Sequence, residues 1–245
     1  CNFKCSFCQN WSISQEKNLH VKEFIDPSRI VEMALKYECA SIAYTYNEPT
    51  IFYPYAKDIA LIAHQKGIKN IFVTNGFASR EVVEDMSGII DALNVDIKSF
   101  NETYTKKNLG AELESLLENL KAWKKKGMWL EITTLIVPTK NDSEEEIHAI
   151  ASFIADELGV DTPWHLSAFH PDFHEQHLPH TPLSTLKRAY EIGKNAGLHH
   201  IYIGNAGVEN TTYCFTCKKV LIERKGFEVI ENFVEESRCP KCKTP

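Results

Sequence analysis

The sequence predicts an α/β fold built from parallel strands that alternate with helices. Six short apolar segments have the pattern of buried strands, and amphipathic segments of helical period separate them. Strands that alternate with helices form parallel βαβ units, and this number of units favours a barrel or partial barrel over a doubly wound open sheet, which stays the alternative. The strands are expected at 41–46, 70–74, 93–98, 129–137, 164–169 and 200–204, with helices around 51–66, 79–87, 111–126, 143–158 and 183–196.

A further helix is expected before the first of these strands. Asp26 is a good N-cap and Pro27 suits the first helical position, so the helix begins here and should end near Cys39. A glycine follows each of four later helices and is expected to end it in the left-handed conformation. These residues are Gly67, Gly127, Gly159 and Gly197.

Composition limits the classes of protein that fit. A chain of 245 residues with 43% hydrophobic content can bury a full core, and its net charge of −6 makes nucleic acid a poor partner. No apolar run approaches the ~20 residues of a membrane span, and no secretory signal precedes Cys1. Seven of the eight cysteines fall in two tight groups, which favours metal ligation in a reducing cytoplasm. The eighth, Cys39, precedes a strand and is expected to be buried as a small apolar residue.

The first eight residues hold three cysteines, Cys1, Cys5 and Cys8. Three thiolates from one loop can bind an iron–sulfur cubane and leave one iron without a protein ligand. A disulfide set or a structural zinc site is the alternative, but three thiols suit neither. The spacing therefore indicates a cluster with an open coordination position.

This spacing, with Phe7 before the third cysteine, resembles the signature of the radical S-adenosylmethionine (radical SAM) superfamily. More narrowly, Cys8-Gln9-Asn10-Trp11 and Ile13-Ser14-Gln15 resemble the radical SAM member of the AmmeMemoRadiSam system, which is related to pyruvate formate-lyase activating enzymes. The resemblance implies a partial (β/α)6 TIM-like barrel, a [4Fe–4S] cluster and S-adenosylmethionine as cosubstrate. It also implies that the strand leading into the cluster loop is missing before Cys1.

Polar residues at the carboxyl ends of strands are the candidates for ligand binding. Asn47 and Glu48 follow the first strand, and Asn75 follows the second. Glu48 can hold the amino group of the cosubstrate or can simply stabilise the start of the next helix. The resemblance favours the first role, and we assign all three residues to the cosubstrate.

Asp96 and Lys98 share one face of the third strand, where they can form an ion pair or face a cavity. The segment resembles one in glycyl-radical activating enzymes, which implies that Asp96 lies near the cosubstrate and Lys98 near the substrate. Glu131, in mid-strand, needs a partner if it is buried, and Lys98 is a candidate.

Three further residues follow or lie on the last strands: His165, His170 and Asn205. The histidines can bind the cosubstrate or move protons, and a purely structural role is the alternative for each. We expect His165 and Asn205 to bind the cosubstrate and His170 to act with Lys98 in catalysis. His174, His177 and His180 lie in a loop with two prolines, which favours a lid or partner-facing loop over a metal site.

The tail carries two CxxC pairs separated by 21 residues: Cys214, Cys217, Cys239 and Cys242. Four thiolates in two knuckles close a tetrahedral zinc site, with an auxiliary iron–sulfur cluster as the alternative. Residues 220–224 and 227–230 flank Lys225-Gly226 and predict a hairpin. Lys218 and Lys243 stand where glycine often follows such knuckles in similar proteins. We therefore expect a barrel over 1–207 and a zinc-ribbon-like module over 208–245.

These features predict a cytoplasmic radical SAM enzyme that abstracts hydrogen from an unknown small molecule or protein. Glycyl-radical activation of a protein partner is one alternative, and a non-catalytic zinc-ribbon module with a structural cluster is another. The resemblance implies an electron donor such as flavodoxin or ferredoxin, and partners of the AmmeMemoRadiSam type.

Overall fold

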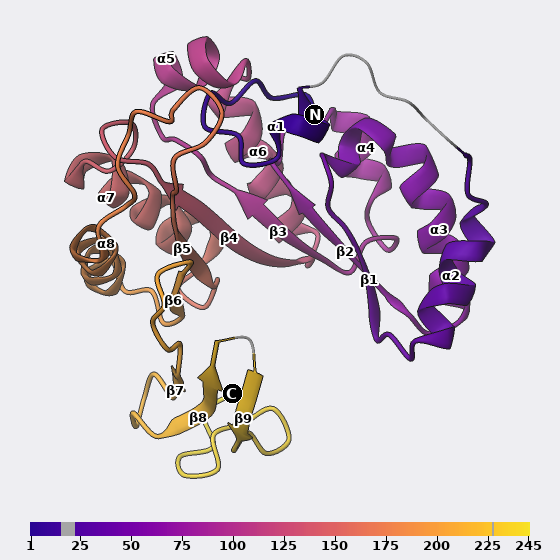
Figure 1. Ribbon diagram of the computed structural model, residues 1–245. Coiled ribbons are helices and arrows are strands. Elements are labelled where there is room, and N and C mark those ends of the chain that lie inside the picture. The colour runs from indigo at the N-terminus through magenta and orange to yellow at the C-terminus, as the bar shows by residue number, and fades with distance from the viewer. Residues whose placement is uncertain (16–22, 227) are drawn as a thin grey trace.

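The computed structural model describes residues 1–15, 23–226 and 228–245 and confirms the α/β fold (Figure 1). Six parallel strands form one sheet, and they agree with the predicted segments to within a few residues. The strands are β1 (Ser41–Tyr44), β2 (Lys69–Thr74), β3 (Ala92–Asp96), β4 (Trp129–Ile136), β5 (Trp164–Ala168) and β6 (Ile201–Gly204).

The strand order separates the two predicted architectures. Neighbouring strands follow the chain, from β1 to β6, and every pair is parallel. A doubly wound sheet reverses its strand order at a switch point, whereas a barrel adds strands consecutively. Among the described residues β1 pairs only with β2 and β6 only with β5, so the sheet is an open, partial barrel.

The predicted helices lie between the strands. Asp26 caps the first long helix through the N–H of Ser28, as expected, but that helix ends at Lys36 rather than near Cys39. Two short helical segments, 11–14 and 102–109, were not predicted. The helical elements are α1 (Trp11–Ser14), α2 (Pro27–Lys36), η1 (Pro49–Phe52), α3 (Tyr53–Gln65), α4 (Arg80–Asp85), α5 (Glu102–Tyr104), η2 (Thr105–Leu109), α6 (Leu113–Lys125), α7 (Glu144–Phe153), η3 (Ile154–Leu158) and α8 (Leu183–Asn195).

The early end of α2 leaves Cys39 exposed, so the prediction that it is buried was wrong. The chain leaves the helix through Glu38, whose φ of 52° is left-handed, and the residues before β1 then run along the surface. None of the helices in the described ranges is both long enough and apolar enough to cross a bilayer.

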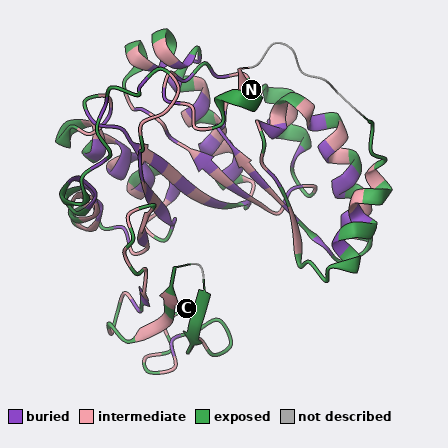
Figure 2. Cartoon of the chain, in the orientation of Figure 1, coloured by how far each residue is buried: buried purple, intermediate pink, exposed green. Residues whose placement is uncertain are grey.

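The sheet buries one face and leaves the other partly open. Along β4 and β5, buried residues alternate with half-buried ones, as the period of a strand requires when its faces meet different surroundings (Figure 2). The buried side includes Ile132 and Leu166 and packs with the helices in the core. The half-buried side lines the concave interior of the barrel, where ligands can enter.

Gly76 holds the turn after β2 close to the core. Its φ is +75°, and a Cβ atom there would lie 2.8 Å from Cγ1 of Val95. Glycine pays no steric penalty at positive φ, and it has no Cβ atom to collide with Val95. The turn can therefore pack against β3. The position of Asn75, one residue earlier, depends on this packing.

The C-terminal residues form a small antiparallel sheet of β7 (Thr212–Tyr213), β8 (Val220–Lys225) and β9 (Glu228–Asn232). The predicted hairpin is thereby confirmed, apart from Phe227, which lies outside the described residues. The sheet lies at the end of the barrel away from α1 (Figure 1). Asn210 joins it to β6 through both the N–H and the carbonyl of Ile203.

Candidate functional site

The loop that carries the first three cysteines is fixed by its aromatic residues. Phe3 and Phe7 are each 2% exposed and anchor the loop in the core. The N–H of Lys4 donates to the carbonyl of Leu109, and the hydroxyl of Ser6 donates to a carboxylate in the loop after β5. Alternation of aromatic and cysteine residues therefore gives the thiols a defined position.

All three thiols border one cavity of about 350 Å³ at the carboxyl ends of the strands. The predicted residues Asn47, Glu48, Asn75, Asp96 and Lys98 line the same cavity. They come from β1, β2 and β3 or from the turns after these strands, because parallel strands end at the same edge of a barrel.

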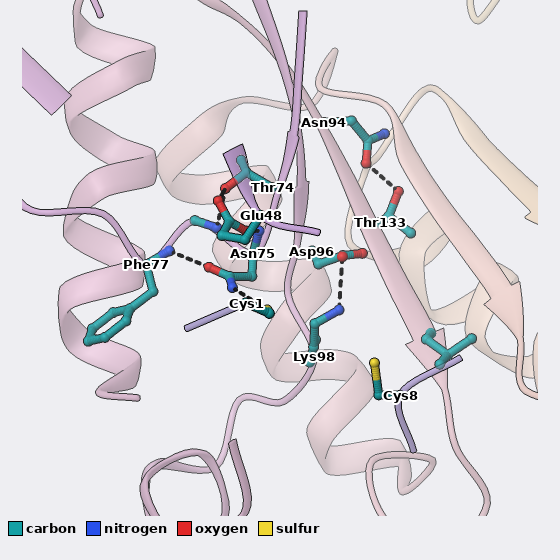
Figure 3. Close-up of polar contacts among 12 residues, drawn as sticks. Cys1, Cys8, Glu48, Thr74, Asn75, Phe77, Asn94, Asp96, Lys98 and Thr133 are labelled. Carbon is teal, nitrogen blue, oxygen red and sulfur yellow. Dashed lines mark hydrogen bonds and ion pairs between the residues drawn. The ribbon is translucent and has the colours of Figure 1, made fainter. Parts of the chain in front are cut away.

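Glu48 is 1% exposed, and its carboxylate is fully engaged by the protein (Figure 3). One oxygen accepts hydrogen bonds from the hydroxyl of Thr74 at 2.6 Å and from the N–H and hydroxyl of Thr50. The other accepts from the N–H of Asn75 at 2.7 Å. Glu48 thus caps η1 and ties the turns after β1 and β2 together.

The two asparagines present amide groups to the cavity. The side-chain nitrogen of Asn75 donates to Asn2 and lies 3.7 Å from the sulfur of Cys1. Asn47 donates to the carbonyl of Ile13, while its own side-chain oxygen is buried without a hydrogen-bond partner among the described residues. A buried acceptor of this kind calls for a donor from a ligand.

Asp96 and Lys98 form an ion pair of 2.8 Å, and in the view of Figure 3 it lies between Cys1 and Cys8. Burial lowers the pKa of the Lys98 ammonium, whereas the Asp96 carboxylate and the nearby thiols raise it. The raising effects together are larger, so the pKa of Lys98 is above its ordinary value. Burial raises the pKa of the Cys5 thiol to about 11, against a smaller lowering by Lys98.

The residues present suit a three-thiol cluster site. Without a metal, the buried Cys5 keeps its proton, and a metal would replace that proton and offset the cost of a buried thiolate. The cavity also supplies a cation in Lys98, an anion in Asp96 and, in Asn47, a buried acceptor to which no described residue donates. A zwitterionic ligand such as an amino acid can use all three.

His165 lies elsewhere. Its ring nitrogen contacts the carboxylate of Glu131 at 2.7 Å, and both residues face a second cavity near the amino ends of the strands. The candidate pairing of Lys98 with Glu131 was therefore wrong: Lys98 lies just past the end of β3 and pairs with Asp96, the last residue of that strand. The hydrogen bond from His165 lowers the pKa of Glu131, although burial raises it.

The other two predicted residues reach the first cavity indirectly. Nδ1 of His170 lies 2.8 Å from the side-chain nitrogen of Gln9, which lines the cavity. Asn205 donates to the hydroxyl of Ser167 at 2.9 Å, and Ser167 also lines it.

The histidine-containing loop packs on the cluster loop. The N–H of His174 donates to the carbonyl of Ser6, and the carboxylate of Glu175 accepts from the Ser6 hydroxyl at 2.6 Å. The loop therefore helps to hold Cys5 and Cys8 in place.

Several cavity residues were not singled out from the sequence. Ser14, whose hydroxyl lies 3.2 Å from the sulfur of Cys8, belongs to the segment that resembles the family, but no function was assigned to it. Thr133 and Ser167 lie on the inner faces of β4 and β5. Strand period places Thr133 on the face of Glu131 and Ser167 on the face of His165, and the strand register then puts Thr133 beside Asp96.

The C-terminal cysteines form a separate group of metal-ligand type. The four sulfur atoms lie within 4.8 Å of one another, with 3.5 Å between Cys214 and Cys242 and 3.6 Å between Cys217 and Cys239. A tetrahedral ion with bonds of about 2.3 Å separates its sulfurs by about 3.8 Å. An iron–sulfur cubane would bind each thiolate to a different iron and spread them further. The group therefore suits one ion.

Lys218 and Lys243 follow the two knuckles with φ of 60° and 59°. These left-handed positions are the ones where glycine was noted in similar proteins. The knuckle geometry is thus kept by lysine, at a conformational cost of roughly 1 kcal/mol each.

The fold and site define a class: an open (β/α)6 barrel that holds a three-thiol loop over the carboxyl ends of its strands. The family model of the radical SAM superfamily matches residues 1–154. An uncharacterized protein of Methanocaldococcus jannaschii is 43% identical over 99% of this chain and 73% of its own length. The chain belongs to the radical SAM superfamily, and the family and its activating-enzyme relatives indicate an enzyme rather than a non-catalytic module.

More distant relatives are activating enzymes. The benzylsuccinate synthase activating enzyme of Thauera aromatica is 27% identical over 50% of this chain and 38% of its own length. The pyruvate formate-lyase 1-activating enzyme of Escherichia coli K12 is 21% identical over 64% of this chain, which spans 65% of that enzyme.

Solved structures share the fold. A domain of the pyruvate-formate lyase-activating enzyme from Bacteroides vulgatus matches with a TM-score of 0.59 and 20% identity, over 67% of this chain and 98% of that one. Streptococcus suis SuiB bound to S-adenosylmethionine matches with a TM-score of 0.65 and 16% identity, over 83% of this chain and 47% of that one.

Proposed function

We propose that this enzyme binds a [4Fe–4S] cluster through Cys1, Cys5 and Cys8 and uses it to cleave S-adenosylmethionine for hydrogen abstraction from a substrate. The observation that carries the proposal is the single cavity shared by the three thiols, the unpaired Asn47 oxygen and the Asp96–Lys98 pair. When bound, the cluster supplies one electron that splits the cosubstrate into methionine and a 5′-deoxyadenosyl radical.

The chain's own residues bind and orient the cosubstrate. The Asn47 oxygen accepts from its ammonium group, and Asn75, held by Glu48, supplies a further amide at the cavity wall. The Lys98 ammonium stays charged because Asp96 raises its pKa, so it can hold an anionic group of cosubstrate or substrate. His170 acts through Gln9, and Asn205 through Ser167.

Anaerobic reconstitution tests this proposal. The chain is loaded with iron and sulfide, given reductant and S-adenosylmethionine, and assayed for 5′-deoxyadenosine. We expect product from the wild type and from Cys39→Ala, the exposed matched control, and none from Cys5→Ala. No product from the wild type, or equal product from Cys5→Ala, would reject the proposal.

Activation of a glycyl-radical enzyme is the second candidate, and the names of two relatives favour it. A survey of neighbouring genes and a pull-down separate the candidates. A glycyl-radical enzyme as partner supports activation, whereas partners of the AmmeMemoRadiSam type support another substrate.

Reduction of the loaded protein by flavodoxin or ferredoxin tests the proposed electron donor, and fractionation of cells tests the proposed cytoplasmic location.

For the C-terminal cysteines we propose a structural zinc ion. The sulfur spacing supports a single tetrahedral ion, and all four ligands are cysteines, which leaves no open position for catalysis.

A further inference from the structure

A second cavity of about 940 Å³ lies between the amino ends of the later strands and the C-terminal module. Glu131, His165 and Tyr202 border it from the barrel, and Phe215 and Arg224 border it from the module. The module therefore forms one wall of a space that leads into the barrel from the end opposite the cluster loop.

The two cavities adjoin each other on the inner face of the sheet, where they share lining residues. Thr133 and Ser167 line both of them. Asn94, which borders the second cavity, accepts a hydrogen bond from Thr133 at 2.8 Å (Figure 3). A molecule held in the second cavity can thus extend towards Asp96 and the thiols.

Arg224 brings a cationic group to this cavity and, among the described residues, forms no ion pair. The guanidinium of Arg224 donates to the carbonyl of Asn210 and to the hydroxyl of Thr212 at 2.7 Å and, within the described ranges, pairs with no carboxylate. The side-chain carboxylates that line the cavity are engaged: Glu131 by His165, and Asp161 by His199, each at 2.7 Å. The charge of Arg224 is therefore available to an anionic ligand.

Flat side chains supply the apolar surface. Trp129 is 58% exposed although it lines the cavity, and its indole N–H is held by Glu131 at 3.1 Å. Tyr202 stacks with His165, and the guanidinium carbon of Arg224 lies 5.8 Å from the centre of its ring. Rings fixed in this way bind planar molecules well.

We propose that this cavity binds the enzyme's substrate and that the substrate is a small planar molecule with an anionic group, held by Arg224 and Trp129. The volume lies within the roughly 300–1,000 Å³ range of small-molecule sites, which favours a small substrate over a protein segment. That the ligand is the substrate rests on the proposed function, whereas binding of a planar anion in this cavity does not.

Calorimetric titration of the zinc-loaded full chain tests the binding site. The probes are 4-hydroxybenzoate and phenyl phosphate, with benzylamine as the cationic counterpart. We expect both aromatic anions to bind at millimolar concentration or below, and about tenfold more weakly to Arg224→Gln. Arg188→Gln removes a guanidinium on α8 that donates to one backbone carbonyl and lies 3.6 Å from the Glu144 carboxylate, and this variant should bind like the wild type. Absence of binding to the wild type, equal binding of benzylamine, or undiminished binding to Arg224→Gln overturns the assignment.

A second variant covers the case in which Arg224→Gln disturbs the module. If that variant loses its zinc, Trp129→Ala decides instead, because it changes only the barrel wall; we expect at least fivefold weaker binding, and wild-type binding rejects the proposal. Measurement of 5′-deoxyadenosine separates the two proposals. If the probes bind but no 5′-deoxyadenosine forms, the binding site is supported and the proposed function is rejected. If 5′-deoxyadenosine forms but no probe binds, the proposed function is supported and the binding site is rejected.

Discussion

The carboxylate of Glu48 accepts a 2.7 Å hydrogen bond from the backbone N–H of Asn75, so the turns after β1 and β2 are held by one buried acid. From the sequence, helix capping and ligand binding were alternative roles for Glu48. The structure supports capping directly, and it places Asn75 at the cavity wall through the same group.

Glu48→Gln is expected to misplace Asn75. One oxygen becomes an NH2 group that cannot accept from a backbone N–H, which should cost about 1–3 kcal/mol of stability. We also expect weaker binding of S-adenosylmethionine by the reconstituted enzyme. Urea denaturation and calorimetry measure the two effects, with the exposed Glu32→Gln as control. Wild-type stability in Glu48→Gln would contradict this role.

Lys98→Met should destabilise the protein by about 1–3 kcal/mol, because it leaves the partly buried Asp96 without its partner. The double variant Asp96→Asn with Lys98→Met removes both charges and should recover part of the loss. Urea unfolding of the two single variants and the double variant forms a complete cycle. Strict additivity would show that the pair contributes no coupling.

Glu131 should contribute to acid stability. His165 lowers its folded pKa below the ordinary 4.5, so the contribution is present above about pH 4.5 and is lost as pH falls through the lower, folded value. Glu131→Gln should therefore lose less stability than the wild type over this acid range. Urea midpoints measured between pH 6 and pH 3 check this, and parallel pH curves for the two proteins would refute it.

Removal of the C-terminal metal should unfold the module and spare the barrel. Cys217→Ser is expected to lose one zinc per chain but to keep the iron bound at the first three cysteines. Metal analysis and limited proteolysis across 208–245 report on the two parts, and Cys39→Ser is the control. Iron in place of zinc at this site would contradict the assignment.

Lys218→Gly should strengthen zinc binding by the module. Glycine removes the steric penalty at φ of 60°, and part of that gain is offset by the entropy of glycine in the unfolded chain. The net effect should be no more than about 1 kcal/mol. Lys219→Gly, at a residue without positive φ, should weaken binding instead. Competition with a chelator measures both variants, and weaker binding by Lys218→Gly would count against the argument.

Local patterns predicted the strands and long helices well. Apolar period, the Asp26-Pro27 start and the hairpin at Lys225-Gly226 all act within a few residues, and the structure confirms each. Cys39 was predicted wrongly because its exposure depends on where α2 ends and how the chain then turns through Glu38. The short helices α1 and α5 have too few residues to show a period.

By itself the sequence determined where the thiols of this protein are grouped, since three cysteines share one loop and four form two CxxC knuckles. It also determined which residues end each strand. Only the tertiary structure decided the contacts between strands and between the two parts: His165 for Glu131, and the module beside the amino ends of the barrel. Such contacts join residues far apart in the chain, and they depend on how neighbouring strands are aligned and how the two parts pack, which no local pattern encodes.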